Sequence, residues 1–303
     1  MNIGMIGLGR MGGNMARRLR RGNMEVVAYN RSLDVTQALA QESGLQAAAS
    51  LQELVDKLSK PRIVWLMLPA GDATQKAIDQ LVPMLDTGDL IVDGGNANYK
   101  DSMRRGMEVA QAGLHYIDAG VSGGVWGLEN GYALMVGGDD IPMKRLEPFM
   151  KVLAPTPTTG WLHCGPVGSG HFVKMVHNGI EYGMMQAFAE GFAMLKGREN
   201  FNLNLADISE MWRHGSVVRS WLLDLTAEFL QDDQKLESIQ PFGPDSGEGR
   251  WTALEAIEQG LPAPVMSLAL MMRFASQGSN DYPAKMLAMM RKGFGGHALK
   301  GDK

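Results

Sequence analysis

A run of nine residues carries four side chains suited to proton transfer: Lys174, His177, Asn178 and Glu181. On an α-helix these positions share one face, because they are spaced three, four and seven residues from the first. An amine, an imidazole, an amide and a carboxylate in this arrangement can take protons from a substrate and return them. The stripe alone is equally compatible with a catalytic site and with a solvated face that carries an i,i+7 salt bridge. The apolar positions between them predict core contacts: Val173, Val176, Ile180 and Met184.

The N-terminus predicts a dinucleotide-binding site. An apolar strand over 3–6 runs directly into Gly-x-Gly-x-x-Gly, formed by Gly7, Gly9 and Gly12, and helix-forming sequence follows. Gly7 permits the tight turn, Gly9 lets the backbone approach a pyrophosphate, and Gly12 lets helix and strand pack closely. The N–H groups at the start of the helix can then bind phosphate. The same loop supplies two further candidate cofactor contacts, Arg10 and Met11.

The end of the second strand, over 25–29, bears on which dinucleotide is bound. An acidic residue there would bind the ribose 2′-hydroxyl of NAD, but this chain has Asn30, Arg31 and Ser32. Because a guanidinium group matches a phosphate, and an amide and a hydroxyl can complete the pocket, the triplet favours NADP. In the alternative interpretation, Arg31 lies over the adenine or points to solvent.

Composition excludes several classes of protein. With 303 residues and a net charge of −4, the chain is long enough for two domains and unsuited to a dedicated nucleic-acid surface. No apolar stretch reaches the roughly 20 residues that a membrane span needs. The first strand leaves no room for a signal peptide, and the single cysteine, Cys164, fits a reducing compartment, so we expect a cytoplasmic protein. Cys164 has no ligand set around it beyond His163, and we expect no metal site.

Hydrophobic patterning predicts an α/β domain followed by an all-α domain. Apolar strands alternating with helices indicate a doubly wound, Rossmann-like parallel sheet covered on both faces. The alternation stops near Pro155, and the remainder is helical, which gives a dinucleotide-binding domain over 1–160 and a substrate and dimerisation domain over 161–303. The expected strands are 3–6, 25–29, 63–68, 90–92, 116–118 and 133–136, and the expected later helices lie near 169–196, 205–230, 250–259 and 262–277.

Six motifs spread along the chain carry a family resemblance. They are Gly-Leu-Gly-Arg-Met-Gly (7–12), Asp-Gly-Gly-Asn (93–96), Gly-Val-Ser-Gly-Gly (120–124), His-Phe-Val-Lys-Met-Val-His-Asn-Gly-Ile-Glu-Tyr (171–182), Ser-Gly-Glu-Gly-Arg-Trp-Thr (246–252) and Arg-Lys-Gly-Phe-Gly-Gly-His (291–297). Together they resemble the shorter-chain branch of the 6-phosphogluconate dehydrogenase family over essentially the whole chain. The run over 171–182 is the most specific, because the broader β-hydroxyacid dehydrogenases share only the first motif and a lysine.

The resemblance implies oxidative decarboxylation of 6-phosphogluconate to ribulose 5-phosphate and CO₂ with NAD(P), in the pentose phosphate pathway. It implies that Lys174 takes the proton of the substrate 3-hydroxyl and that Glu181 delivers a proton to C1 of the enediol. Asn96 and His177 would hold the reacting oxygens. The β-keto acid formed by oxidation loses CO₂ readily, so this chemistry needs no metal.

The resemblance also implies contacts for each part of the ligands. Ser122, Gly123 and Gly124 would bind the carboxylate end of the sugar acid, and Asn178 would lie beside Asn96 and His177 at the reacting oxygens. The implied phosphate contacts are Tyr182, Arg273, Arg291 and His297, of which the last two would come from a partner subunit of a homodimer or higher homo-oligomer. The alternative for those two is a frayed basic tail. The further cofactor contacts are Leu68, Pro69 and Asn96.

Two departures from the family leave alternatives open. Longer members carry a lysine and a threonine where this chain has Ser246 and Glu248, so we do not transfer that substrate contact. The helical part is also shorter, and shorter members include NAD-preferring enzymes. A β-hydroxyacid dehydrogenase acting on a small acid such as 3-hydroxyisobutyrate, or a non-catalytic nucleotide-binding protein, are the competing interpretations.

Overall fold

A computed structural model describes residues 2–278 and 281–295, with side chains as far as residue 290. The chain divides into two compact units, Met1–Val176 and His177–Lys303. The long helix α8 (Ser169–Gly197) begins in the first unit and continues into the second. Each unit is described by itself.

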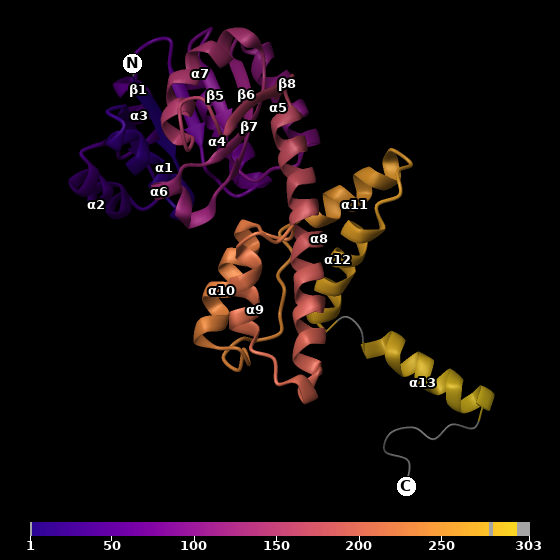
Figure 1. The fold of residues 1–303 in the computed structure, drawn as a ribbon. Coiled ribbons are helices and arrows are strands. Elements are labelled where there is room, and N and C mark those ends of the chain that lie inside the picture. Colours follow the sequence, from indigo (N-terminus) through magenta and orange to yellow (C-terminus); the bar gives the residue numbers. More distant parts are fainter. Residues whose placement is uncertain (1, 279–280, 296–303) are drawn as a thin grey trace. The chain divides into compact units, whose positions relative to one another are not determined.

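Within the first unit, residues 2–176 build an eight-stranded sheet in the order β3-β2-β1-β4-β5-β6-β7-β8 (Figure 1). The strands from β1 to β6 pair in parallel, whereas β7 is antiparallel to β6 and pairs in parallel with β8. The strand bounds are β1 (Asn2–Ile6), β2 (Glu25–Tyr29), β3 (Gln46–Ala47), β4 (Ile63–Leu66), β5 (Leu90–Asp93), β6 (His115–Ser122), β7 (Ala133–Gly137) and β8 (Trp161–Gly165).

Helices cover both faces of this sheet, as the strand sequences predict. In β4, Ile63 and Trp65 enter a core with α1 (Arg10–Arg21) and α7 (Asp140–Leu153). Val64 and Leu66 point the other way, into a core with α3 (Leu51–Lys57), α4 (Asp72–Leu81) and α5 (Tyr99–Gln111). Burial on both faces explains the continuous apolar strands, and each fully buried aliphatic side chain contributes about 1.5–3 kcal/mol. The remaining elements of this unit are α2 (Leu33–Ser43), η1 (Val82–Met84), η2 (Gly124–Trp126) and α6 (Gly127–Asn130).

The sheet differs from the sequence prediction in several details. The pattern missed β3, which is two residues long, and β8, whose side chains are mostly half-buried and give no apolar run. The sheet therefore extends to Gly165, beyond the expected domain boundary at residue 160. The expected parallel direction of β7 was wrong, because the connection from β6 holds only short helical turns, too little for the crossover that a parallel pair requires. The strand predicted over 63–68 ends at Leu66.

The second unit is helical in the part that the structure describes. Beyond α8 and η3 (Glu199–Phe201), α9 (Leu205–Arg213) packs against α10 (Trp221–Asp232), and α11 (Glu248–Glu258) packs against α12 (Pro264–Ser276). The last helix is α13 (Asp281–Gly295). The amide oxygen of Asn204 and the hydroxyl of Ser220 cap α9 and α10, which explains where both helices begin. None of the described helices is both apolar enough and long enough to cross a membrane.

The apolar side of α8 does not form the core that its sequence predicts. Val173 is 39% exposed, Ile180 52% and Met184 39%, and Val176 is half-buried. A small core around Leu205 takes only the last turns of the helix. The helix therefore carries more apolar surface than the described residues of one chain cover.

Candidate active site

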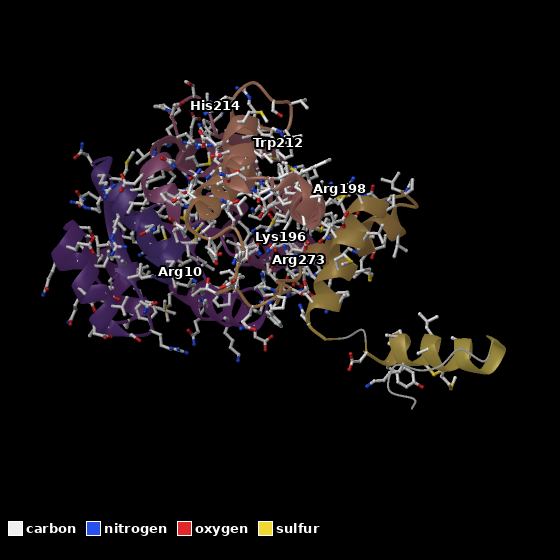
Figure 2. All side chains as sticks on the ribbon, turned by 60° about the horizontal axis from the view of Figure 1, so that its bottom comes forward. Arg10, Lys196, Arg198, Trp212, His214 and Arg273 are labelled. Carbon is white, nitrogen blue, oxygen red and sulfur yellow. The ribbon has the colours of Figure 1, made fainter. Side chains whose placement is uncertain are left out.

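The glycine loop joins β1 to α1 and has the geometry that a dinucleotide requires. Gly7 has a φ of +90°, and a Cβ on Gly12 would lie 2.0 Å from the carbonyl oxygen of Gly7, so neither position accepts a side chain. A Cβ on Gly9 would meet no described atom within 4 Å. Gly9 therefore presents bare backbone at the helix N-terminus, where a pyrophosphate can approach. Arg10 and Met11 follow at the start of α1, and the Arg10 side chain is exposed (Figure 2).

The residues after β2 divide between structure and surface. The amide oxygen of Asn30 accepts a hydrogen bond from the backbone N–H of Leu8 at 3.2 Å, so Asn30 holds the glycine loop in place. Arg31 and Ser32 are exposed beside this loop. Asn30 thus has a structural role, holding the glycine loop, that the sequence did not reveal. The guanidinium of Arg31 is accessible to a ligand.

The loops after β4 and β5 lie against each other at the carboxyl edge of the sheet. A Cβ on Gly95 would lie 2.6 Å from the carbonyl oxygen of Leu68, so the two backbones touch. Pro69 and the side chain of Asn96 are exposed there. The carboxyl ends of β1, β4 and β5 are neighbours in the sheet, and this edge is where ligands bind in folds of this kind.

The end of β6 continues this edge. Ser122 closes the strand, and Gly123 and Gly124 follow with φ values of +138° and +54°. The side-chain amide of Asn14 on α1 donates to the carbonyl of Val125 at 3.3 Å. This contact ties the turn after Gly124 to the helix of the glycine loop.

Lys174 is held against β6 by close packing. Lys174 is 8% exposed. A Cβ added to Gly120 would lie 2.4 Å from the Cβ of Lys174. One turn earlier, a Cβ on Gly170 would lie 2.5 Å from the carbonyl oxygen of Met135. The first turns of α8 can approach the strands this closely only because both positions are glycine.

A buried carboxylate fixes where α8 begins. Asp118 on β6 accepts the backbone N–H groups of Gly168 at 2.6 Å and His171 at 2.7 Å. Burial raises the pKa of the Asp118 carboxyl, against the opposing effect of the neighbouring imidazole and N–H groups. The imidazole of His171 is hydrogen-bonded in turn to the hydroxyl of Ser102, with 2.7 Å between Nδ1 and Oγ. The sequence analysis assigned no role to these residues, although His171 is the first residue of one of its motifs and Asp118 lies two residues before another.

In the second unit, the rest of the polar stripe on α8 makes local contacts. The His177 Nδ1 atom lies 3.0 Å from Asn178 Oδ1 and 3.8 Å from Glu181 Oε2. All three side chains are half-buried. The imidazole is therefore oriented by an amide and lies near a carboxylate, an arrangement suited to proton exchange.

Tyr182 is the centre of a second polar group. Its hydroxyl is 3.1 Å from that of Ser246, which donates to a carboxylate oxygen of Glu248 at 2.8 Å. The guanidinium of Arg273 lies 3.6 Å from the ring centroid of Tyr182 and donates to the carbonyl of Pro244. Figure 2 labels Arg273 on α12. Glu248 is 3% exposed, and its second carboxylate oxygen has no partner among the described residues.

Two of the predicted phosphate contacts have side chains outside the described residues. Arg291 lies in α13, but its side chain is outside the described residues, and so is all of His297. Over residues 2–278 and 281–290, no cluster of three or more His, Cys, Asp or Glu side chains is arranged to hold a metal ion.

Comparison with known proteins gives a consistent result. The family model described as the NAD binding domain of 6-phosphogluconate dehydrogenase matches residues 2–164, and that of the 6-phosphogluconate dehydrogenase C-terminal domain matches residues 170–293. A Haloferax volcanii protein named NAD(+)-dependent, decarboxylating 6-phosphogluconate dehydrogenase is 41% identical over 301 residues, covering 99% of this chain and 98% of its own.

Solved structures agree with the sequence matches. The 6-phosphogluconate dehydrogenase of Plasmodium falciparum, solved with NADP⁺ and with 6-phosphogluconate, has a TM-score of 0.85 and 29% identity, covering all of this chain and 67% of its own. A Mycobacterium tuberculosis 3-hydroxyisobutyrate dehydrogenase has a TM-score of 0.72 at 21% identity, covering 92% of this chain and 94% of its own, which shows a shared fold alone. With both family models matched along nearly its whole length, this chain belongs to the 6-phosphogluconate dehydrogenase family.

Proposed function

We propose that this chain oxidises and decarboxylates 6-phospho-D-gluconate to ribulose 5-phosphate and CO₂, with reduction of NADP or NAD. The proposal rests mainly on the burial of Lys174, which packs on Gly120. Gly120 lies two residues before Ser122, and Lys174 belongs to the same unit as the glycine loop. A non-catalytic nucleotide-binding protein has no use for a buried amine at that place, because burial of an amine is costly.

Each reacting proton has a proposed residue. Lys174 takes the proton of the 3-hydroxyl while the bound nicotinamide ring supplies the acceptor for the hydride from C3. Loss of CO₂ then leaves the bonding electrons in an enediol, and Glu181 gives a proton to its C1. Asn96 and His177 hold the reacting oxygens, and their amide and imidazole groups can both donate and accept hydrogen bonds.

The ends of the substrate have proposed partners as well. Ser122, Gly123 and Gly124 bind the carboxylate through a hydroxyl and backbone N–H groups, and Asn178 assists His177, to which its amide is hydrogen-bonded. Tyr182 and Arg273 bind the phosphate, and the stacked, partly exposed guanidinium of Arg273 supports this assignment. We further propose that Arg291 and His297 complete the phosphate site from a partner subunit.

We propose a homodimer or higher homo-oligomer in the cytoplasm. Apolar side chains exposed on α11 and α12 support an interface, because monomers rarely expose contiguous apolar surface of this kind. They are Leu254, Ile257, Val265, Leu268, Met271 and Met272. In the proposed division of work, the domain expected over 1–160, whose sheet extends to Gly165, binds the dinucleotide. The helical remainder of the region expected over 161–303 serves substrate binding and dimerisation.

We propose NADP as the preferred cofactor. The exposed guanidinium of Arg31 follows β2, where it can pair with a 2′-phosphate. The Haloferax relative is named as NAD-dependent, so the preference has to be measured rather than transferred.

Release of CO₂ tests the proposed function. The purified protein should release CO₂ from 6-phosphogluconate with NADP and, less efficiently, with NAD. Gluconate and 3-hydroxyisobutyrate are the comparison substrates, because neither offers a phosphate to Arg273. Faster turnover of 3-hydroxyisobutyrate than of 6-phosphogluconate would establish the alternative, a dehydrogenase of small unphosphorylated acids.

A further inference from the structure

A fully buried ion pair lies behind the loops at the carboxyl edge of the sheet. Asp93, the last residue of β5, has no exposed side-chain surface, and Arg105 on α5 is 1% exposed. Their closest oxygen and nitrogen are 3.0 Å apart. Desolvating two charges is costly, and a hydrophobic pair of similar volume often stabilises a fold equally well. Stability alone therefore gives no strong reason for an ion pair at this place.

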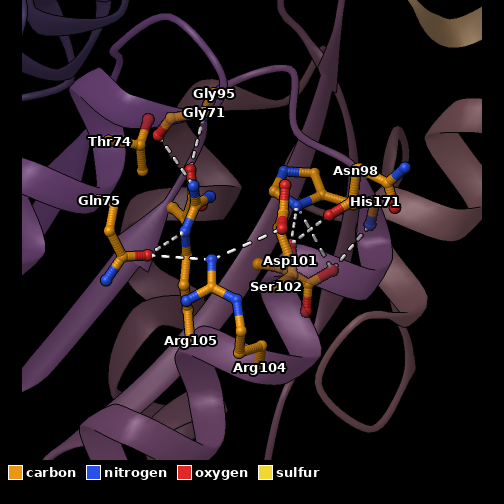
Figure 3. A network of polar contacts seen from close by, with 12 residues as sticks. Gly71, Thr74, Gln75, Gly95, Asn98, Asp101, Ser102, Arg104, Arg105 and His171 are labelled. Carbon is orange, nitrogen blue, oxygen red and sulfur yellow. Dashed lines mark hydrogen bonds and ion pairs between the residues drawn. The ribbon is translucent and has the colours of Figure 1, made fainter.

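The guanidinium of Arg105 binds two loops at once (Figure 3). One Nη donates to the Asp93 carboxylate, and the other donates to the backbone carbonyl of Gly71 at 3.0 Å. Its Nε donates to the amide oxygen of Gln75 at 3.1 Å. Gly71 precedes α4 and ends the loop after β4, whereas Asp93 begins the loop after β5. A planar fork of donors can span two acceptors in this way, and a lysine amine cannot do so in a fixed geometry.

Asp93 passes this constraint on to the loop that it begins. Its other carboxylate oxygen accepts the backbone N–H of Gly95 at 3.2 Å, and the phenol of Tyr116 donates to the oxygen shared with Arg105 at 2.9 Å. Burial and the charge of Asp93 raise the pKa of Tyr116, which keeps the phenol protonated as a donor. Gly95 in turn touches the backbone of Leu68. The loop after β4 and the loop after β5 are thus joined twice, through the guanidinium of Arg105 and through the contact between Gly95 and Leu68.

We propose that Arg105 is a positioning residue that sets the spacing of the two loops carrying Leu68, Pro69 and Asn96, and hence the alignment of the nicotinamide with the substrate. The inference rests on the proposed function for its kinetic consequence. Its structural part, the spacing of the cofactor loops, is independent of the substrate.

The same two strands carry a matched control at their opposite ends. Arg62 directly precedes β4, and its guanidinium pairs with Asp89, which directly precedes β5, at 2.9 Å. Arg62 is 9% exposed and Asp89 1%. Arg62 also donates to a backbone carbonyl, that of Val55. Both pairs are largely buried and join the same two strands, although Arg62 also binds the more exposed carboxylate of Asp86 at 2.7 Å. Only Arg105 adjoins the proposed cofactor loops.

The experiment compares Arg105→Lys and Arg105→Met with Arg62→Lys and Arg62→Met. For each variant we would measure the melting temperature, the dissociation constant of NADP by calorimetry, and kcat and KM with 6-phosphogluconate. We would also measure the isotope effect on kcat/KM with substrate deuterated at C3. All four variants should melt at lower temperature than the wild type.

A positioning role separates the two series. The Arg105 variants should lose up to about a hundredfold in kcat/KM, since small displacements of reacting groups have effects of that size. They should also bind NADP more weakly and show a larger isotope effect, because hydride transfer becomes slower than other steps. The Arg62 variants should keep the wild-type kcat/KM, NADP affinity and isotope effect, although their melting temperature falls by a comparable amount.

Several results would overturn the inference. Loss of activity in proportion to melting temperature across both series would show that Arg105 acts on stability alone. Wild-type NADP binding and isotope effect in Arg105→Lys would do so as well, even if Arg105→Met does not fold. If the wild type itself fails to oxidise 6-phosphogluconate, the proposed function is wrong, while the NADP affinities of the two series still decide whether Arg105 positions the loops.

Discussion

At the scale of single residues, Lys174 can lie close to the sheet because Gly120 and Gly170 have no side chain. Gly120 and Gly170 allow the first turns of α8 to lie directly on β6 and β7, and a methyl group at either position would overlap atoms already there. The base of the proposed reaction is therefore fixed by backbone contact. Its position should be sensitive to the smallest possible change in volume.

Gly120→Ala tests that sensitivity. The added Cβ would lie 2.4 Å from the Cβ of Lys174. Overpacking of this kind costs about 1–3 kcal/mol of unfolding free energy, and displacement of the base should lower kcat on the order of a hundredfold. Gly191→Ala is the control, since a Cβ there meets no described atom within 4 Å, and should stabilise α8 by up to about 1 kcal/mol. Unchanged kcat in Gly120→Ala would mean that the packing does not position Lys174.

Lys174→Met removes the proposed base while preserving the length of the side chain. Loss of a positioned base typically lowers the rate about 10²–10⁴-fold. NADP affinity, measured by calorimetry, should stay close to that of the wild type because the cofactor is bound by other residues. Near-normal turnover would remove Lys174 from the mechanism.

Arg31→Ala tests the cofactor preference. Loss of a charge-assisted hydrogen bond to a phosphate costs on the order of 1.5–3 kcal/mol. The KM for NADP should rise roughly ten- to a hundredfold, and that for NAD should hardly change. Equal losses with both cofactors would show instead that Arg31 lies over the adenine.

At the scale of elements, the start of α8 depends on a carboxylate from the sheet rather than on a capping residue of its own. Asp118 binds two N–H groups of the first turn, and His171 joins the same turn to Ser102 on α5. The helix that carries Lys174 is thereby joined to β6 and α5. This anchoring uses a buried acid whose protonation state affects stability.

The stability conferred by Asp118 should depend on pH in a defined direction. Burial raises the pKa of this carboxyl in the folded protein, so the folded state holds its proton more tightly than the unfolded chain. Its contribution is fully present below the unfolded pKa of about 3.9 and declines as pH rises through the folded pKa.

Asp118→Asn, which cannot titrate, isolates the effect. Urea unfolding between pH 4 and 7 should show the wild type losing free energy of unfolding relative to the variant as pH rises. The amide presents a donor to one of the two N–H groups, which adds a cost that does not vary with pH. A difference between the two proteins that is constant, or that grows with pH, would contradict the raised pKa.

At the scale of the whole molecule, the part of one chain that the structure describes leaves apolar surface uncovered along α8, α11 and α12. The described part of α13 is also exposed, including Leu287, Met289 and Met290. A second copy of the chain would cover such surfaces, and the proposed phosphate contacts Arg291 and His297 follow on the same terminal segment. Assembly and catalysis would then be linked.

Subunit complementation tests that link. A chain truncated after Gly278 and the Lys174→Met variant should each be inactive alone. Mixed dimers pair an intact Lys174 in one subunit with an intact C-terminal segment in the other, so activity should return to a substantial fraction of the wild type. Sedimentation velocity should confirm that mixed dimers form. Mixed dimers without activity would show that the segment serves its own subunit.

The sequence by itself determined the repeating elements and the chemistry that they carry. Apolar strands such as Ile63–Leu66 follow from burial on two faces, and Gly7 and Gly12 follow from a backbone turn that excludes side chains. The spacing of Lys174, His177 and Glu181 likewise follows from helix periodicity alone. Those features needed no knowledge of distant neighbours.

Only the tertiary structure decided which polar residues are structural. Asp93, Arg105 and Asp118 look like surface charges in sequence, yet the sheet and α5 enclose them. The antiparallel direction of β7 and the exposure of Ile180 also depend on what packs nearby. Burial is a property of contacts between segments far apart in the chain, and local periodicity carries no information about those contacts.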